Sequence, residues 1–243
     1  MTDDEMQTYN IPNTPFQYSG VVPESLTDSE YTLACFVTDT SGSVGSYVND
    51  LEKALDISLE SCKKSPRAGN IRARTLTFND KVSELHGYSE LTKIEPYAGK
   101  LSCSGYTALY DAVYNAIGAT VDYAKKLQDL YYSVNAVIYI ITDGMDNRST
   151  YRPEDIKKLI SDVVKKEQLG FLTTLLIGIN EDTDTKRYLD DFKNGAELTK
   201  YISIGDASSS KLAHLGGFIS KSLSSSSQSL ANGTAPDTNA LSF

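Results

Sequence analysis

One carboxylate and two hydroxyls occur at alternate positions in the segment Asp39-Thr40-Ser41-Gly42-Ser43. The segment follows the apolar run Leu33–Val37, so we expect it in the loop at the carboxyl end of a buried strand. In open α/β sheets, ligands bind at that edge. Oxygen ligands suit a hard cation such as Mg²⁺ or Mn²⁺, whereas Zn²⁺ prefers cysteine and histidine, which the loop lacks. The segment therefore indicates an oxygen-lined metal site.

The elements around this loop alternate between apolar strands and helix-like segments. This order predicts an α/β, Rossmann-like fold with a doubly wound, mostly parallel central sheet and helices on both faces. One antiparallel edge strand is expected at Lys81–Leu85, after a tight turn that follows the strand Ile71–Phe78. The other predicted strands are Thr32–Thr38, Val134–Ile141, Phe171–Ile179 and Tyr201–Ile204, and the predicted helices begin near Val48, Leu109, Pro153, Lys186 and Leu212.

Two further loops carry polar residues at the boundaries of expected elements. Thr107 lies just before the helix that begins near Leu109, and Asp143 and Gly144 follow the most apolar strand of the chain. If that strand neighbours the one before Asp39, the two carboxylates converge at one edge of the sheet. Each motif alone could also be a helix cap or a turn, so the combination carries the argument.

Together, the three motifs resemble the von Willebrand factor A domain and its metal-ion-dependent adhesion site. The pattern of that site is Asp-x-Ser-x-Ser, a distant Thr and a distant Asp. Asp39, Ser41 and Ser43 match its first part, Thr107 the second and Asp143 the third. The resemblance implies that the three hydroxyls touch the metal, and that the aspartates bind it directly or through water.

Such a site is expected to bind a partner and not to catalyse a reaction. Hydroxyls are neutral, so an ion held by at most two carboxylates stays electrophilic, and Mg²⁺ usually keeps exchangeable waters. A partner's Asp or Glu can replace one of them. We therefore expect a non-enzymatic, Mg²⁺- or Mn²⁺-dependent adaptor for a protein partner, with Tyr106, Asp146 and Asn147 on the partner-binding rim. The resemblance to bacterial members implies service to an ATPase-linked stress or defence system.

Two alternatives stay open: a Mg²⁺-dependent phosphatase or phosphotransfer enzyme, and a structural subunit with a metal staple. A haloacid-dehalogenase-type phosphatase needs a second acid two residues after the first Asp, where this chain has Ser41. A serine hydrolase would need a Gly-x-Ser-x-Gly elbow, but the residue two positions before Ser43 is Ser41 and not glycine. No Gly-x-x-x-x-Gly-Lys loop indicates a nucleotide site.

The composition bears on the class of partner and on the compartment. The formal net charge of -9 argues against a nucleic-acid partner, because such binding needs a basic surface. The three cysteines lack metal-type spacing and indicate reduced thiols, so we expect a cytoplasmic protein. No apolar run approaches the roughly 20 residues of a membrane span, so no membrane partner is expected. Nothing in the sequence indicates an oligomeric state.

The two ends of the chain are more polar than its centre. Residues 1–29 contain scattered prolines and are expected to form an arm or a loosely docked cover. Residues 30–223 are the expected A-type domain. Residues 224–243 form a Ser-rich tail that is expected to bury too little apolar surface to order itself.

Overall fold

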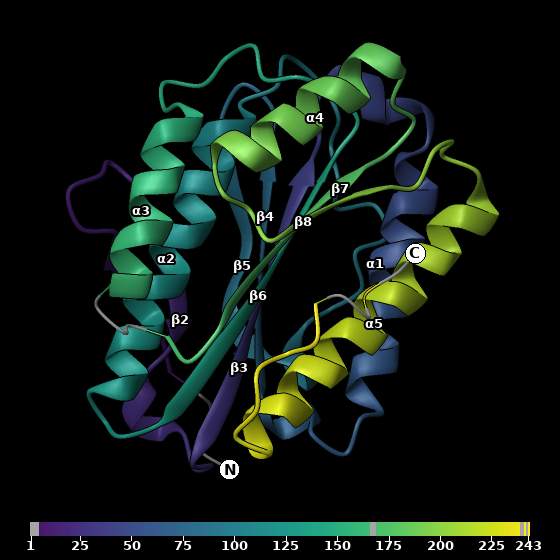
Figure 1. Cartoon of the computed structure of the whole chain (residues 1–243). Helices are drawn as coiled ribbons and strands as arrows, with labels where there is room; N and C mark the ends of the chain where they lie inside the picture. Colours follow the sequence, from purple (N-terminus) through teal and green to yellow (C-terminus); the bar gives the residue numbers. More distant parts are fainter. Residues whose placement is uncertain (1–4, 166–168, 239–240, 242) are drawn as a thin grey trace.

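The computed structural model describes residues 5–165, 169–238, 241 and 243 and contains an eight-stranded sheet with helices on both faces (Figure 1). The order of the strands is β1-β2-β5-β4-β3-β6-β7-β8. The strands are β1 (Met6–Asn10), β2 (Gln17–Val21), β3 (Glu30–Asp39), β4 (Ile71–Phe78), β5 (Val82–Glu90), β6 (Ser133–Thr142), β7 (Leu172–Gly178) and β8 (Lys200–Ser203). The helices are α1 (Val48–Lys63), α2 (Leu109–Gln128), α3 (Pro153–Lys165), α4 (Thr183–Gly195) and α5 (Ser209–Ala231). None of the helices in the described ranges is long and apolar enough to cross a membrane.

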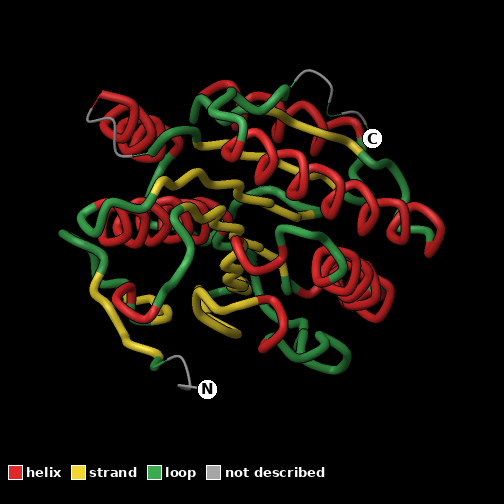
Figure 2. Tube along the Cα trace, turned by 90° about the horizontal axis from the view of Figure 1, so that it is seen from below, coloured by secondary structure: helices red, strands yellow, loops and turns green. Residues whose placement is uncertain are grey.

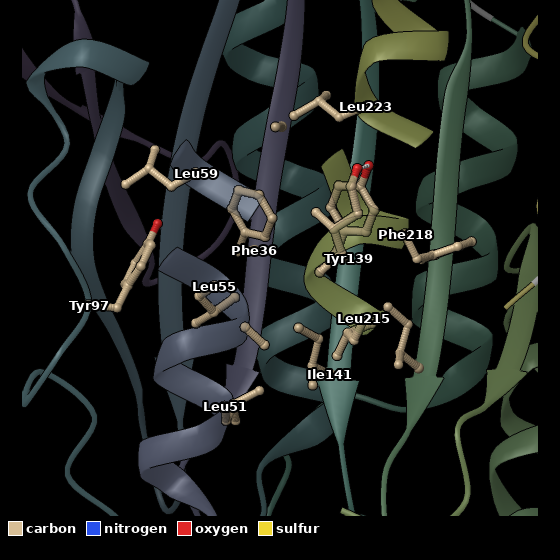
Figure 3. Packing of buried hydrophobic residues seen from close by; sticks show 14 of the residues in the cluster. Phe36, Leu51, Leu55, Leu59, Tyr97, Tyr139, Ile141, Leu215, Phe218 and Leu223 are labelled. Atoms are coloured by element: carbon tan, nitrogen blue, oxygen red, sulfur yellow. Dashed lines mark hydrogen bonds between the residues drawn. The ribbon is translucent and has the colours of Figure 1, made fainter. Parts of the chain in front are cut away.

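The central strands bury apolar side chains on both faces of the sheet. In β3, Ala34 and Phe36 belong to the cluster under α1 and α5, while Cys35 and Val37 belong to the cluster under α2, α3 and α4. Figure 2 shows the strands between two layers of helices, and Figure 3 shows the first cluster, where the rings of Phe36 and Tyr139 stack 5.3 Å apart. This burial explains the near-continuous apolar runs in the sequence. The predicted doubly wound fold class is confirmed.

Strand pairing places the candidate site at one edge of the sheet. β3 lies between β4 and β6 and is parallel to both, and Thr38 is paired with Ile141. The ends of β3 and β6 therefore lie side by side, which was the condition for Asp39 and Asp143 to converge. β5 is antiparallel to β4, as the hairpin turn predicted.

The described part of the predicted arm, from residue 5 onward, forms sheet structure and not a loose cover. β1 and β2 make a hairpin that pairs with β5 at Gly20 and Tyr88, so the sheet extends beyond the predicted antiparallel strand. Tyr18 is 1% exposed and lies edge-on to the rings of Tyr88 and Tyr123, which stack 4.8 Å apart. Because only a few aromatic side chains attach this segment to the core, its sequence shows no regular alternation of apolar and polar residues.

Gly87 permits the close approach of β2 to β5, because a Cβ at this position would overlap the backbone of Ser19. We expect Gly87→Ala to lower the free energy of unfolding by about 1–3 kcal/mol, since the hairpin must shift to relieve the overlap. Urea unfolding of both proteins measures this loss. The control is Gly217→Ala on the exposed side of α5, where a Cβ meets no atom within 4 Å. It should leave stability unchanged or raise it by up to about 1 kcal/mol. Equal stability of the two variants would contradict the steric argument.

The Ser-rich tail predicted at residues 224–243 is helical at its start, because α5 continues to Ala231. Its buried serines have hydrogen-bond partners. Asn135 Nδ2 donates to Ser226 Oγ at 3.1 Å, and Arg67 Nε donates to Ser227 Oγ at 2.9 Å. Since the buried serine hydroxyls are paired, burial of a serine-rich face costs little. The prediction of an unstructured tail is therefore wrong up to residue 231. Residues 239, 240 and 242 lie outside the described ranges.

Candidate metal centre

Three loops meet at the carboxyl ends of β3 and β6. In the loop after β3, the Gly42 amide donates to the carbonyl of Gly105 at 3.2 Å, and Thr40 accepts from the Ser104 amide at 2.9 Å. The loop after β6 joins them through the Asn147 amide, which donates to the carbonyl of Thr107 at 3.0 Å. Backbone hydrogen bonds thus fix the spacing of the loops.

The carboxylate of Asp39 is held from two sides at the centre of these loops. Its Oδ1 accepts from the amide of Ser41 at 2.8 Å, and its Oδ2 accepts from the hydroxyl of Thr142 at 2.6 Å. Asp39 is 1% exposed. The side chain is therefore fixed by a turn of its own loop and by the last residue of β6.

The other predicted metal residues lie around Asp39. The hydroxyl of Ser43 donates to Asp143 Oδ1 at 2.8 Å, and the hydroxyls of Ser41 and Ser43 are 3.2 Å apart. Thr107 Oγ1 lies 3.9 Å from the point that a Cβ on Gly144 would occupy. The structure thus connects Asp39, Ser41, Ser43 and Asp143 and places the Thr107 hydroxyl near Gly144, the residue after Asp143.

The helix-cap alternative does not account for these hydroxyls. Ser41 precedes the short 3₁₀ helix Gly42–Ser46, but its side chain forms no capping hydrogen bond. The N-cap of α2 is Ala108 and not Thr107, and it also lacks a side-chain cap. The hydroxyls of Ser41 and Ser43 instead face each other and the carboxylate of Asp143.

The electrostatics of the site favour a positively charged ligand. Burial raises the pKa of the Asp39 carboxyl to about 6; the hydrogen bonds from Thr142 and Ser41 oppose this shift, and the charge of Asp143 adds to it. Burial, and then Asp143, also raise the pKa of Tyr47. No lysine or arginine among the described residues forms an ion pair with either carboxylate within 4 Å. A divalent cation would stabilise the ionised form of both aspartates.

The donor set fits a hard cation. It consists of two carboxylates and three hydroxyls, and oxygen ligands of this kind suit Mg²⁺ or Mn²⁺. Among the described residues, no group of three or more His, Cys, Asp or Glu side chains could hold a metal ion. The candidate centre differs from such groups because hydroxyls supply most of its side-chain ligands.

The three predicted rim residues differ in their contacts. Tyr106 is 62% exposed and projects beside Thr107. Asn147 Oδ1 accepts from the backbone amide of Thr107 at 2.9 Å, and the backbone amide of Asn147 donates to the carbonyl of Thr107. Asp146 Oδ2 accepts from the amide of Tyr110 at 3.1 Å, in the first turn of α2. The side chains of Asp146 and Asn147 therefore position α2 and Thr107, whereas the side chain of Tyr106 is mostly exposed.

Sequence reasoning missed two residues that shape the site. Thr142 directly precedes Asp143 in the chain, yet its hydroxyl binds Asp39. Asp80 lies against Gly105, where a Cβ would overlap its carboxylate, and Gly105 has a φ of +75°. The Gly before Tyr106 was the available signal, because a positive φ and a close approach both favour glycine.

No protein-family model and no curated protein matches the chain. Solved structures do. The PilB minor pilin from Streptococcus sanguinis has 18% identity and a TM-score of 0.58, over 86% of this chain and 64% of that one. The pilus adhesin SpaC from Lactobacillus rhamnosus GG, in its open conformation, has 11% identity and a TM-score of 0.55, over 90% of this chain and 34% of that one. Proximal thread matrix protein 1 from the mussel byssus has 19% identity and a TM-score of 0.50, over 81% of this chain and 47% of that one. The chain spans less than two thirds of each, and the likeness is one of fold.

Proposed function

We propose that this chain is a metal-dependent protein-binding module. The observation that carries the proposal is the convergence of Asp39, Ser41, Ser43, Thr107 and Asp143 from three loops. These residues would hold Mg²⁺ or Mn²⁺. The bound ion would supply a Lewis-acidic position for a carboxylate of a protein partner. Asp39 is buried, while Ser43 is exposed and Asp143 half-buried, so the outer side of the site is accessible to another protein.

The surface beside the site offers contacts to such a partner. Tyr106 and Met145 are 62% and 36% exposed and stand on the loops that carry Thr107 and Asp143. Arg148 lies beside them, 3.9 Å from the carboxylate of Asp80. One charge-assisted contact contributes roughly 1.5–3 kcal/mol, so apolar contacts at the rim must add to it. The preferred partner would present an Asp or Glu next to an apolar side chain.

The fold occurs in a protein described as a pilus adhesin, which is compatible with a binding role. On the resemblance of the motifs alone, we propose a cytoplasmic adaptor in an ATPase-linked stress or defence system. The proposal is of binding and not of turnover, because an ion held by neutral hydroxyls and at most two carboxylates would keep an exchangeable position that a partner's carboxylate can fill.

The double variant Ser41→Ala and Ser43→Ala tests the proposal. We expect wild-type protein to capture a partner from lysate with Mg²⁺ but not with chelator, and the variant to capture none in either condition, because two neutral ligands are lost. The melting temperature should change little. Ser25→Ala, which removes an exposed hydroxyl just before the amino end of β3, opposite the end that carries the site, is the control and should bind as wild type does.

Three outcomes would contradict the proposal. Capture by the double variant at wild-type level would show that partner binding does not depend on the proposed metal ligands. A fall in melting temperature equal to that caused by chelator would favour a structural staple. Phosphatase activity that disappears in Asp39→Asn while partner capture persists would favour an enzyme.

A further inference from the structure

Arg148 stands on the loop after β6, beside the candidate metal centre. Its backbone is held there by the residue before it, because Asn147 Oδ1 accepts from the amide of Thr107 at 2.9 Å and the amide of Asn147 donates to the carbonyl of Thr107 at 3.0 Å. We propose that Arg148 selects a partner with two carboxylates, one for the metal and a second for the guanidinium. This inference rests on the proposed function, because the first carboxylate must complete a bound cation.

The side chain of Arg148 extends toward the loop that carries Thr107. Its Nε lies 3.9 Å from Asp80 Oδ1, and the same oxygen accepts from the amide of Tyr106 at 3.3 Å. Asp80 thus links the guanidinium to the residue directly before Thr107. Arg148 is therefore fixed next to the centre at both ends, its backbone through Asn147 and its side chain through Asp80.

The contact with Asp80 leaves the guanidinium available to a ligand. The closest approach of the two charged groups, 3.9 Å, is beyond hydrogen-bond distance, and their side chains are 60% and 39% exposed. An exposed ion pair of this kind contributes little to stability. Among the described residues, the guanidinium of Arg148 donates no hydrogen bond. Its planar fork of N–H groups can therefore bind a carboxylate through two parallel hydrogen bonds.

The charges of the centre explain why a basic residue matters at its rim. With a divalent ion bound, Asp39 and Asp143 together balance the charge of the ion. Asp80 and the formal net charge of -9 then repel an acidic partner. Arg148 is the one basic residue in the sequence segments 39–46, 102–108 and 143–150, which form the site. It is therefore the group in these loops that can attract and orient an acidic partner.

The guanidinium and the metal ligands require separate carboxylates. Arg148 forms no ion pair within 4 Å with Asp39 or Asp143, and its nearest acidic neighbour, Asp80, binds the backbone at Tyr106 and not a metal ligand. One carboxylate on the ion would therefore leave the guanidinium without a ligand. The partner that uses both groups presents two acidic side chains on one segment, so a single Asp or Glu would bind more weakly.

Linear carboxylates test the proposal on the Mn²⁺-loaded protein, with protein in excess over metal. Acetate has one carboxylate, and succinate, glutarate and adipate have two at increasing separation. We expect at least one of these three to bind wild type about tenfold more tightly than acetate, because it adds a charge-assisted contact. In Arg148→Gln this preference should fall to about twofold, the statistical gain from two equivalent groups. The relaxation rate of water protons measures binding, because a carboxylate displaces water from Mn²⁺.

Arg187→Gln is the matched control, because it removes an exposed arginine that is also paired with an aspartate, Asp184. It should keep the wild-type preference for two carboxylates. Both variants should bind Mn²⁺ at least as tightly as wild type does, since neither arginine is a candidate metal ligand. This measurement also establishes that Arg148→Gln is folded at the centre.

The outcomes separate this inference from the proposed function. A preference for two carboxylates that survives in Arg148→Gln would mean that both bind the ion, and would overturn the role of Arg148. Equal binding of acetate and all three dicarboxylates to wild type would overturn it as well. In both cases Mn²⁺ binding persists and the proposed metal centre stands. If wild type binds no Mn²⁺, the proposed function fails and this inference fails with it.

Discussion

Asp39→Asn should weaken the binding of Mg²⁺ and Mn²⁺ by at least about 100-fold, since removal of groups that only support metal ligands already costs 10–100-fold. The substitution keeps the shape of the side chain that Ser41 and Thr142 contact. It removes the negative charge of the carboxylate, which attracts the cation. Calorimetric titration of each metal into wild-type and variant protein measures the effect.

The same variant should remain folded without metal. Asp39 is a buried carboxyl whose pKa is raised to about 6 by burial, so the loss of its charge does not remove a stabilising interaction with a cationic residue. Asp184→Asn is the matched control, because it neutralises an exposed carboxylate paired with Arg187. Metal affinity that falls equally in both variants would reflect the net charge of the protein and not the site. Unchanged affinity in Asp39→Asn would refute the assignment of the centre.

Arg74→Ala should cause the largest loss of stability, about 3–5 kcal/mol, because it removes a buried guanidinium and leaves the partly buried Glu84 without its counter-charge. The Arg74 side chain is 1% exposed. Its Nε donates to Glu84 Oε2 at 2.5 Å, and its Nη2 donates to Asn115 Oδ1 at 3.0 Å. Glu84 also accepts from the amide of Ser19 at 3.0 Å. The guanidinium therefore connects β4, β5, α2 and the N-terminal hairpin.

Urea unfolding of Arg74→Ala and of Arg187→Ala measures this difference. Arg187 pairs with Asp184 on the exposed side of α4, where the two side chains are 74% and 73% exposed. Its replacement should change stability by no more than about 0.5 kcal/mol. If the two variants were equally stable, the buried network around Arg74 would contribute nothing measurable to the fold.

The central part of the fold could be predicted because its signals are local and redundant. β3 and β6 are buried on both faces, so their apolar runs are nearly continuous, and a polar motif follows each run. Parallel neighbours end at the same edge of a sheet. The convergence of Asp39 and Asp143 therefore needed only the adjacency of two strands, which the structure confirms.

The ends of the chain could not be predicted because their partners are distant. Tyr18 is buried against rings of β5 and α2, and its hydroxyl donates to Asp122 at 2.7 Å. Ser226 is buried because Asn135, on β6, bonds to it. A local pattern does not reveal that a polar or aromatic residue will meet a partner about one hundred positions away. Propensity and composition therefore favoured loops in segments whose secondary structure depends on tertiary contacts.

The contacts of the three predicted rim residues could not be predicted either, because the sequence does not show the direction of their side chains. Tyr106, Asp146 and Asn147 stand in polar loops, and nothing in their types indicates that Asn147 binds the backbone of Thr107. Such contacts become visible only when the loops are placed in space.

The docking of β2 on β5 has a consequence for the order in which the chain can fold during synthesis. β2 leaves the ribosome before its partners do, because Gly20 pairs with Tyr88, and the hydroxyl of Tyr123 donates to the carbonyl of Val21 at 2.7 Å. Tyr88 is made 68 residues after Gly20, and Tyr123 is made 102 residues after Val21. A two-stranded hairpin alone is marginally stable in water. We therefore expect β1 and β2 to acquire their native contacts only after β5 and α2 have been made, and expect their apolar side chains to stay exposed until then.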